Sequence, residues 1–178
     1  MRQFLGLCCC LVTGLVAAEV VDVSPQGFVS KHELVLVASP EAGYRALVEE
    51  VDQWWDASHS FAGDASAFRI DDVAGGCFCE INGDTEVVHL TVVNVSRGKS
   101  ITFRGGLGPL QAMAVTGAMT FAFAEHEQGS TLKYSYSVGG YVPGGLDQLA
   151  NAVDQVQLGQ LLRLQKFLAE RAGSELGQ

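Results

Sequence analysis

The chain has 178 residues, of which 20 are acidic and 11 are Lys or Arg, so its formal net charge is −9. Its basic residues are scattered, which argues against a nucleic-acid partner, because phosphate contacts need grouped Lys and Arg. The length is enough for one domain with a substantial core.

The first 18 residues have the pattern of a secretory signal peptide. Arg2 is followed by an uncharged apolar run over 4–16, and small residues precede Glu19. The run is shorter than the ~20 apolar residues that a membrane span needs. We therefore expect a signal peptide over 1–18, one domain over 19–178, a periplasmic or secreted location, and no stable membrane insertion after cleavage.

The first predicted elements are a strand and a helix. Residues 28–37 end in alternation and predict the strand. Ser39 and Pro40 favour a helix start, because Ser can cap the first turn and Pro suits the first helical position. Apolar residues continue at helical spacing as far as Trp54 and Trp55. These two rings cannot easily both face the core, so we expect one of them to line the cavity mouth; the alternative is that the pair anchors the end of the helix.

A series of strands follows the helix. We expect them over 68–73, 77–82, 86–96, 100–104, 115–125 and 131–139. The last two alternate cleanly, which is typical of an antiparallel sheet with one wet face. The side chains predicted to face inward are Ile101, Phe103, Met119, Phe121, Phe123, Leu132, Tyr134 and Tyr136.

Cys77 and Cys79 lie two residues apart in a predicted strand. This geometry disfavours a disulfide without local distortion, so we expect two buried thiols, although export keeps a disulfide open. Nothing nearby completes a metal-ligand set. With the cysteines inward, Glu80 should be exposed, and His89 should be exposed in phase with Thr91. If that phase is reversed, Glu80 becomes a buried carboxylate and a catalytic candidate.

The chain ends in a long predicted amphipathic helix over 145–171. Its apolar stripe consists of Leu146, Ala150, Val153, Leu161, Leu164 and Leu168. Gln157 and Gln160 fall on the same face. An unpaired buried amide costs about 1–3 kcal/mol, so these amides need fixed partners or a cavity that is not fully dry. Tyr134 and Tyr136 are the expected partners; otherwise the amides are free to meet a ligand.

The order of strand, helix, meandering strands and long helix resembles the helix-grip superfamily, which includes START-like lipid-transfer domains and SRPBCC proteins. The resemblance covers 28–170 and rests on Ser39-Pro40-Glu41, Trp54-Trp55, Gly75-Gly76 and the terminal helix. The chain is most similar to bacterial polyketide cyclase/dehydrase-like and heat-shock ATPase activator-like members. The resemblance implies an α+β fold in which a curved antiparallel sheet wraps around the C-terminal helix and encloses an apolar cavity. The predicted signal peptide argues against the cytosolic activator role.

We therefore expect an exported binder or carrier of a small hydrophobic molecule of the lipid, sterol or polyketide class. No catalytic, metal-binding or phosphate-binding motif is present in the sequence, so no cofactor is expected. The candidate ligand contacts are Trp54, Trp55, Phe121, Phe123, Tyr134, Tyr136, Val153, Gln157, Gln160 and Leu164. Two alternatives remain open. One is a cyclase- or dehydratase-type enzyme using an acid–base residue such as His59 or Glu80, and the other is a ligand-free stress-related interaction module.

Overall fold

The fold is built on one sheet of eight antiparallel strands. The computed structural model describes residues 19–175, and the predicted signal peptide lies outside them. The strands are β1 (Glu19–Ser24), β2 (Gly27–Leu36), β3 (Phe68–Ile70), β4 (Cys77–Asn82), β5 (Thr85–Ser96), β6 (Ser100–Arg104), β7 (Ala114–His126) and β8 (Gly129–Tyr141). Their order across the sheet is β1-β2-β8-β7-β6-β5-β4-β3, so pairing of β2 with β8 joins the two ends of the domain.

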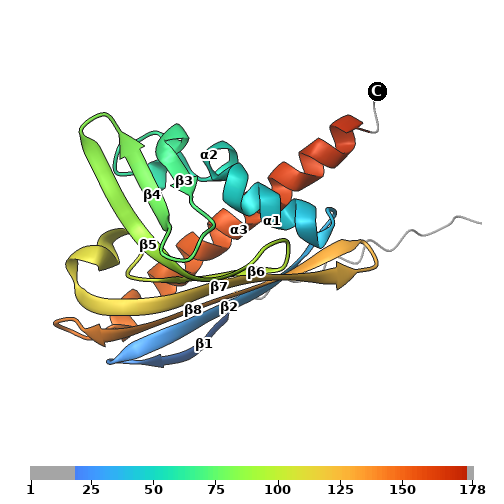
Figure 1. Cartoon of the computed structure of the whole chain (residues 1–178). Helices are drawn as coiled ribbons and strands as arrows, with labels where there is room; N and C mark the ends of the chain where they lie inside the picture. Colours follow the sequence, from blue (N-terminus) through green and yellow to red (C-terminus); the bar gives the residue numbers. More distant parts are fainter. Residues whose placement is uncertain (1–18, 176–178) are drawn as a thin grey trace, which may run out of the picture.

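The helices lie against one face of this curved sheet (Figure 1). They are α1 (Pro40–Glu49), α2 (Val51–Trp54) and α3 (Asp147–Glu175), with short 3₁₀ turns η1 (Ala57–His59), η2 (Ala65–Ala67) and η3 (Gly108–Ala112). The long helix α3 contacts β1 and β2 on one side and α1 and α2 on the other. The predicted α+β architecture of a curved antiparallel sheet and a long C-terminal helix is confirmed. Within residues 19–175, no helix is both long and apolar enough to cross a membrane.

Local sequence signals explain where the helices begin. Ser39 caps α1 by accepting a hydrogen bond from the Ala42 N–H, and Pro40 occupies the first turn as predicted. The single helix expected up to Trp55 is divided at Glu50 into α1 and α2. The predicted terminal helix is confirmed, and α3 runs from Asp147 to Glu175, slightly later than expected at both ends.

The core lies between the inner face of the sheet and the helices. All eight side chains that alternation placed inward are buried. The strand β1 was not predicted, and it forms a hairpin with β2 in which Ser24 pairs with Gly27. Its register shift between Val20 and Asp22 breaks the regular alternation by which a strand is recognised in a sequence.

Candidate functional site

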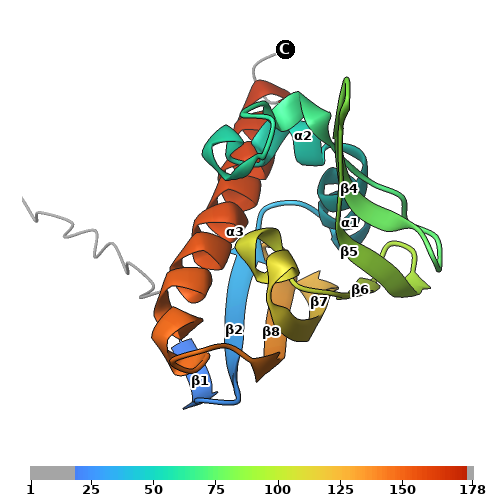
Figure 2. The same cartoon turned by 90° about the vertical axis from the view of Figure 1, so that its left-hand side faces the viewer.

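A cavity of about 410 Å³ lies between α3 and the loops at the β4–β5 end of the sheet. Figure 2 shows that η3 and the segment that follows α2 lie beside α3. Residues of both segments line the cavity. The wall residues are Trp55, Ser58, His59, Ser60, Phe61, Phe68, His89, Leu107, Gly108, Pro109, Leu110, Met113, Leu149, Ala152, Val153, Val156 and Gln157. Most of these are apolar, and a cavity of this size and lining is typical of small-molecule sites.

Gln157 reaches the cavity from α3 and also has a fixed partner. Its side chain is 4% exposed, and its Oε1 accepts a hydrogen bond from the Tyr134 hydroxyl at 2.9 Å. Burial raises the pKa of Tyr134 well above its ordinary value, with smaller contributions from Tyr136 and Asp154. The hydroxyl therefore keeps its proton and remains a donor. The expected pairing of Gln157 with a sheet tyrosine is confirmed.

Gln160 has a different partner from the predicted tyrosines. Its Oε1 accepts the Asp56 N–H at 3.0 Å, which directs its amide nitrogen to His59 Nδ1 at 3.1 Å. The amide therefore ties the segment after α2 to α3. It also places the exposed ring of His59 at the edge of the cavity, with Nδ1 as an acceptor.

Tyr136 holds the glycine-rich loop that leads into η3. Its hydroxyl donates to the Gly105 carbonyl at 3.2 Å and accepts from the Leu107 N–H at 3.0 Å. Burial raises the pKa of Tyr136 to about 12. A Cβ at Gly117 would lie 2.5 Å from the Tyr136 ring, so only glycine leaves room for this side chain. The tyrosine thereby positions Leu107, which lines the cavity.

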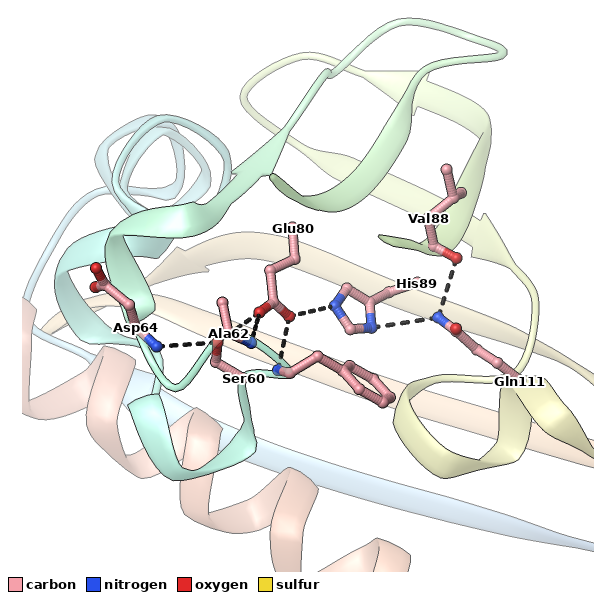
Figure 3. A network of polar contacts seen from close by, with 8 residues as sticks. Ser60, Ala62, Asp64, Glu80, Val88, His89 and Gln111 are labelled. Atoms are coloured by element: carbon pink, nitrogen blue, oxygen red, sulfur yellow. Dashed lines mark hydrogen bonds and ion pairs between the residues drawn. The ribbon is translucent and has the colours of Figure 1, made fainter. Parts of the chain in front are cut away.

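Glu80 and His89 form a buried pair, which corrects the expectation that both are exposed. Glu80 is 0% and His89 is 3% exposed, and the Nε2 of His89 lies 3.1 Å from a Glu80 carboxylate oxygen. Glu80 also accepts hydrogen bonds from the Ser60 hydroxyl at 2.5 Å, the Phe61 N–H at 3.1 Å and the Ala62 N–H at 2.5 Å (Figure 3). Four donors converge on the carboxylate, and these hydrogen bonds offset the cost of burying its charge.

Register explains the incorrect prediction. Phe78 and Glu80 share the inner face of β4, and the cysteines lie on the other face. In β5, Leu90 pairs with Phe78 and Val88 pairs with Cys79, so His89 is the extra residue of a β-bulge. A bulge inserts one residue into the alternation, and His89 and Leu90 consequently both point inward.

The pKa values of His89 and Glu80 are both lowered, which favours a neutral imidazole beside an ionised carboxylate. Burial lowers the pKa of His89 more than Glu80 raises it, so the pKa lies below the ordinary 6.5. Burial raises the pKa of Glu80, but hydrogen bonds from Ser60, Ala62, Phe61 and His89 outweigh it and bring the pKa below the ordinary 4.5. Neutral His89 donates Nε2–H to Glu80 and accepts at Nδ1 from the Gln111 amide at 3.3 Å (Figure 3).

Acid should destabilise the fold in two steps because of these shifts. The unfolded chain protonates His89 at about pH 6.5 and Glu80 at about pH 4.5, whereas the folded chain protonates each at a lower pH. Protons therefore favour unfolding, and each group's contribution is full above its unfolded pKa and is lost as the pH falls toward its folded pKa. Urea titrations from pH 8 to 4 should show stability falling first below about pH 6.5. In His89→Gln this first step should flatten, and an unchanged slope would contradict the assignment.

A second buried acid–histidine pair joins α3 to β2. Asp154 is 2% exposed, and its Oδ1 accepts a hydrogen bond from the Ser30 hydroxyl at 2.5 Å. The same Oδ1 lies 2.9 Å from His32 Nε2, which also lies within hydrogen-bond distance of Ser30 Oγ at 3.3 Å. The His32 ring also stacks on Tyr134, with ring centroids 5.9 Å apart. Because Tyr134 holds Gln157, this pair supports the cavity wall from behind.

Cys77 and Cys79 form a disulfide, which corrects the expectation of two buried thiols. Their Cα atoms are 5.4 Å apart, within the usual range for a disulfide. The pairing of β4 with β5 is irregular at this place, because the register shifts between Phe78 and Cys79. In the part of the chain that the structure describes, no group of three or more potential metal-ligating side chains is present.

Comparison with known proteins identifies the fold. No protein-family model matches the sequence, and no curated protein matches it either. An uncharacterised protein from Rhizobium leguminosarum has a similar structure, with a TM-score of 0.60 and 20% identity over 82% of this chain and 96% of its own. The di-domain ARO/CYC StfQ from the steffimycin biosynthetic pathway has a TM-score of 0.56 and 16% identity over 84% of this chain and 53% of its own. Ara h 8.0201 has a TM-score of 0.53 and 13% identity over 80% and 97%.

This is the helix-grip fold. The eight-stranded curved sheet and the long helix α3 are the parts that the resemblance implied. At these identities the likeness concerns the fold alone. The function has to be argued from the cavity of this chain.

Three of the ten candidate contacts lie on the wall of the helix-grip cavity, namely Trp55, Val153 and Gln157. The other seven are buried outside the wall, and these are Trp54, Phe121, Phe123, Tyr134, Tyr136, Gln160 and Leu164. Aromatic packing is the reason: Phe121 contacts Phe103 and Tyr134 at centroid distances of 6.2 and 5.1 Å, so rings fill the space over the central strands. The open space lies beyond these rings, toward β4 and β5.

The residues that support the site were only partly visible in the sequence. Ser30 and His32 lie between Phe28 and Leu34 at a spacing of two residues, so all four share one face of β2. The apolar ends of this series indicate that the polar pair lies on a buried face. Asp154 lies seven residues before Leu161 and so shares its side of the helix. The loop donors of Glu80, by contrast, carry no such signal, because two of them are backbone N–H groups.

Proposed function

We propose that the protein binds or carries a small, mostly apolar molecule in the cavity between α3, η3 and the segment after α2. The observation that carries this proposal is the cavity itself, about 410 Å³ with walls that are chiefly apolar. Among the ten contacts predicted from the sequence, Trp55, Val153 and Gln157 are the proposed ligand contacts. We further propose that the protein acts outside the cytoplasm, as the N-terminal pattern predicts.

The alternative enzyme function depends on a titratable group that can act on a ligand. His89 lines the cavity, but Glu80 and Gln111 engage its two ring nitrogens. His89 would therefore offer a proton acceptor only if Gln111 left its Nδ1. The geometry therefore supports binding better than catalysis. The ligand-free interaction module would need a cavity filled by side chains, which an open volume of about 410 Å³ disfavours.

Filling the cavity should abolish binding of an apolar probe. N-phenyl-1-naphthylamine is uncharged, and its fluorescence rises in apolar surroundings. With the wild-type protein we expect a saturable rise, and with Val153→Phe we expect affinity to fall by about tenfold or more because the added ring occupies the space. Fluorescence titration measures both.

The matched control is Leu162→Phe on the outer side of α3, where the side chain is 39% exposed. This variant should bind the probe as the wild type does. The proposal fails if the wild-type protein gives no saturable signal, or if both variants bind equally well. Circular dichroism checks that each variant remains folded.

A further inference from the structure

We infer that the ligand is uncharged and presents a hydrogen-bond acceptor, such as a ketone carbonyl, to the polar side of the cavity. This inference rests on the proposed function and names the class of molecule that the same cavity accepts. The class of ligand follows from the charges and the free hydrogen-bond donors on the wall, because an apolar lining alone does not distinguish one apolar molecule from another.

Charge excludes two common classes of apolar ligand. None of the residues on the described wall is Lys, Arg, Asp or Glu. A carboxylate or phosphate head group would therefore lose its hydration without meeting a Lys or Arg side chain, and the Glu80 carboxylate is buried behind His89. An ammonium group gains little from Glu80, because four donors already converge on its oxygens.

Hydrogen-bond donors are in excess on the polar side. Gln157 uses Oε1 for Tyr134, and among the described residues no hydrogen bond engages its Nε2. His59 accepts from Gln160 at Nδ1, which leaves its Nε2–H as a second donor at the cavity edge. The indole N–H of Trp55 is buried in the same wall with no partner in the described chain.

Two side-chain acceptors close to these donors, on Gln160 and Ser60, are already occupied. Gln160 Oε1 accepts from Asp56, and the Ser60 hydroxyl donates to Glu80 and accepts from the Asp64 N–H. A ligand that brings an acceptor satisfies the free donors, whereas a pure hydrocarbon leaves them unpaired at a cost of about 1–3 kcal/mol for a fully buried group. The arrangement therefore selects for an acceptor on an otherwise apolar molecule.

Three naphthalenes of similar size test the inference by displacing N-phenyl-1-naphthylamine. They are 2-acetylnaphthalene, the hydrocarbon 2-ethylnaphthalene and the anion 2-naphthoate. In Gln157→Leu, affinity for the ketone should fall about three- to tenfold, and affinity for the hydrocarbon should be unchanged or higher. In the wild type, naphthoate should be weaker than the ketone by about tenfold or more.

A rim variant keeps the test valid if Gln157→Leu does not fold. His59→Ala should also lower affinity for the ketone selectively. His126 is an exposed histidine at the β7–β8 turn, and His126→Ala should leave all three affinities unchanged. The inference is overturned if naphthoate binds as tightly as the ketone, or if the folded variants lose ketone and hydrocarbon equally. Failure of the uncharged probe to bind the wild type at all would instead overturn the proposed function.

Discussion

Replacing Asp154 by alanine is expected to lower the free energy of unfolding by about 3–5 kcal/mol. The carboxylate is 2% exposed, accepts a hydrogen bond from the Ser30 hydroxyl and lies 2.9 Å from His32 Nε2. Its loss removes the acceptor of the Ser30 hydroxyl and the charged partner of His32 between α3 and β2, and also leaves a small void. Urea denaturation at pH 7 measures the change.

Two further variants separate the buried pair from a general effect of charge. Glu170→Ala removes a carboxylate from the exposed side of the same helix, where Glu170 pairs with Lys166 at 3.6 Å, and should cost only about 0.3–0.5 kcal/mol. His32→Leu combined with Asp154→Leu removes both partners and should recover much of the loss of Asp154→Ala. A loss below about 1 kcal/mol for Asp154→Ala would show that the pair does not join helix and sheet.

The fold was largely predictable because its main elements follow regular periods. The strands β7 and β8 alternate over most of their length, and α3 carries an apolar stripe at helical spacing. Ser39 and Pro40 marked the start of α1. The division of the first helix at Glu50 and the irregular strand β1 escaped prediction, since neither carries a strong turn or period signal.

The site was less predictable because it depends on interruptions of those periods. The bulge at His89 turns a polar side chain inward, and no residue in the sequence marks it. The phase of β4 was inferred from Cys77 and Cys79 as apolar residues, whereas the structure joins them on the outer face and buries Glu80 instead. The position of the cavity depends on how loops distant in sequence meet α3, which periodicity does not specify.

Glu80→Ala should be comparably severe, with a loss of about 3–5 kcal/mol in the free energy of unfolding at pH 7. Four donors lose their acceptor at once, from Ser60, Phe61, Ala62 and His89. Two of these donors are backbone groups in the loop after η1, whose residues Ser60 and Phe61 line the cavity. The variant should therefore also weaken binding of N-phenyl-1-naphthylamine at temperatures where it remains folded.

The matched control is Glu86→Ala, which removes an exposed carboxylate from β5 and should change stability by no more than about 0.5 kcal/mol. The loss of stability in Glu80→Gln should lie between those of Glu80→Ala and Glu86→Ala. The amide oxygen of the glutamine still accepts from the loop, whereas its NH₂ faces other donors. Hydrogen exchange of the Phe61 and Ala62 amides reports directly on the loop, and both should exchange faster in Glu80→Ala than in Glu86→Ala. Unchanged protection of these amides would mean that the carboxylate does not hold the loop, and the cavity wall would then need another support.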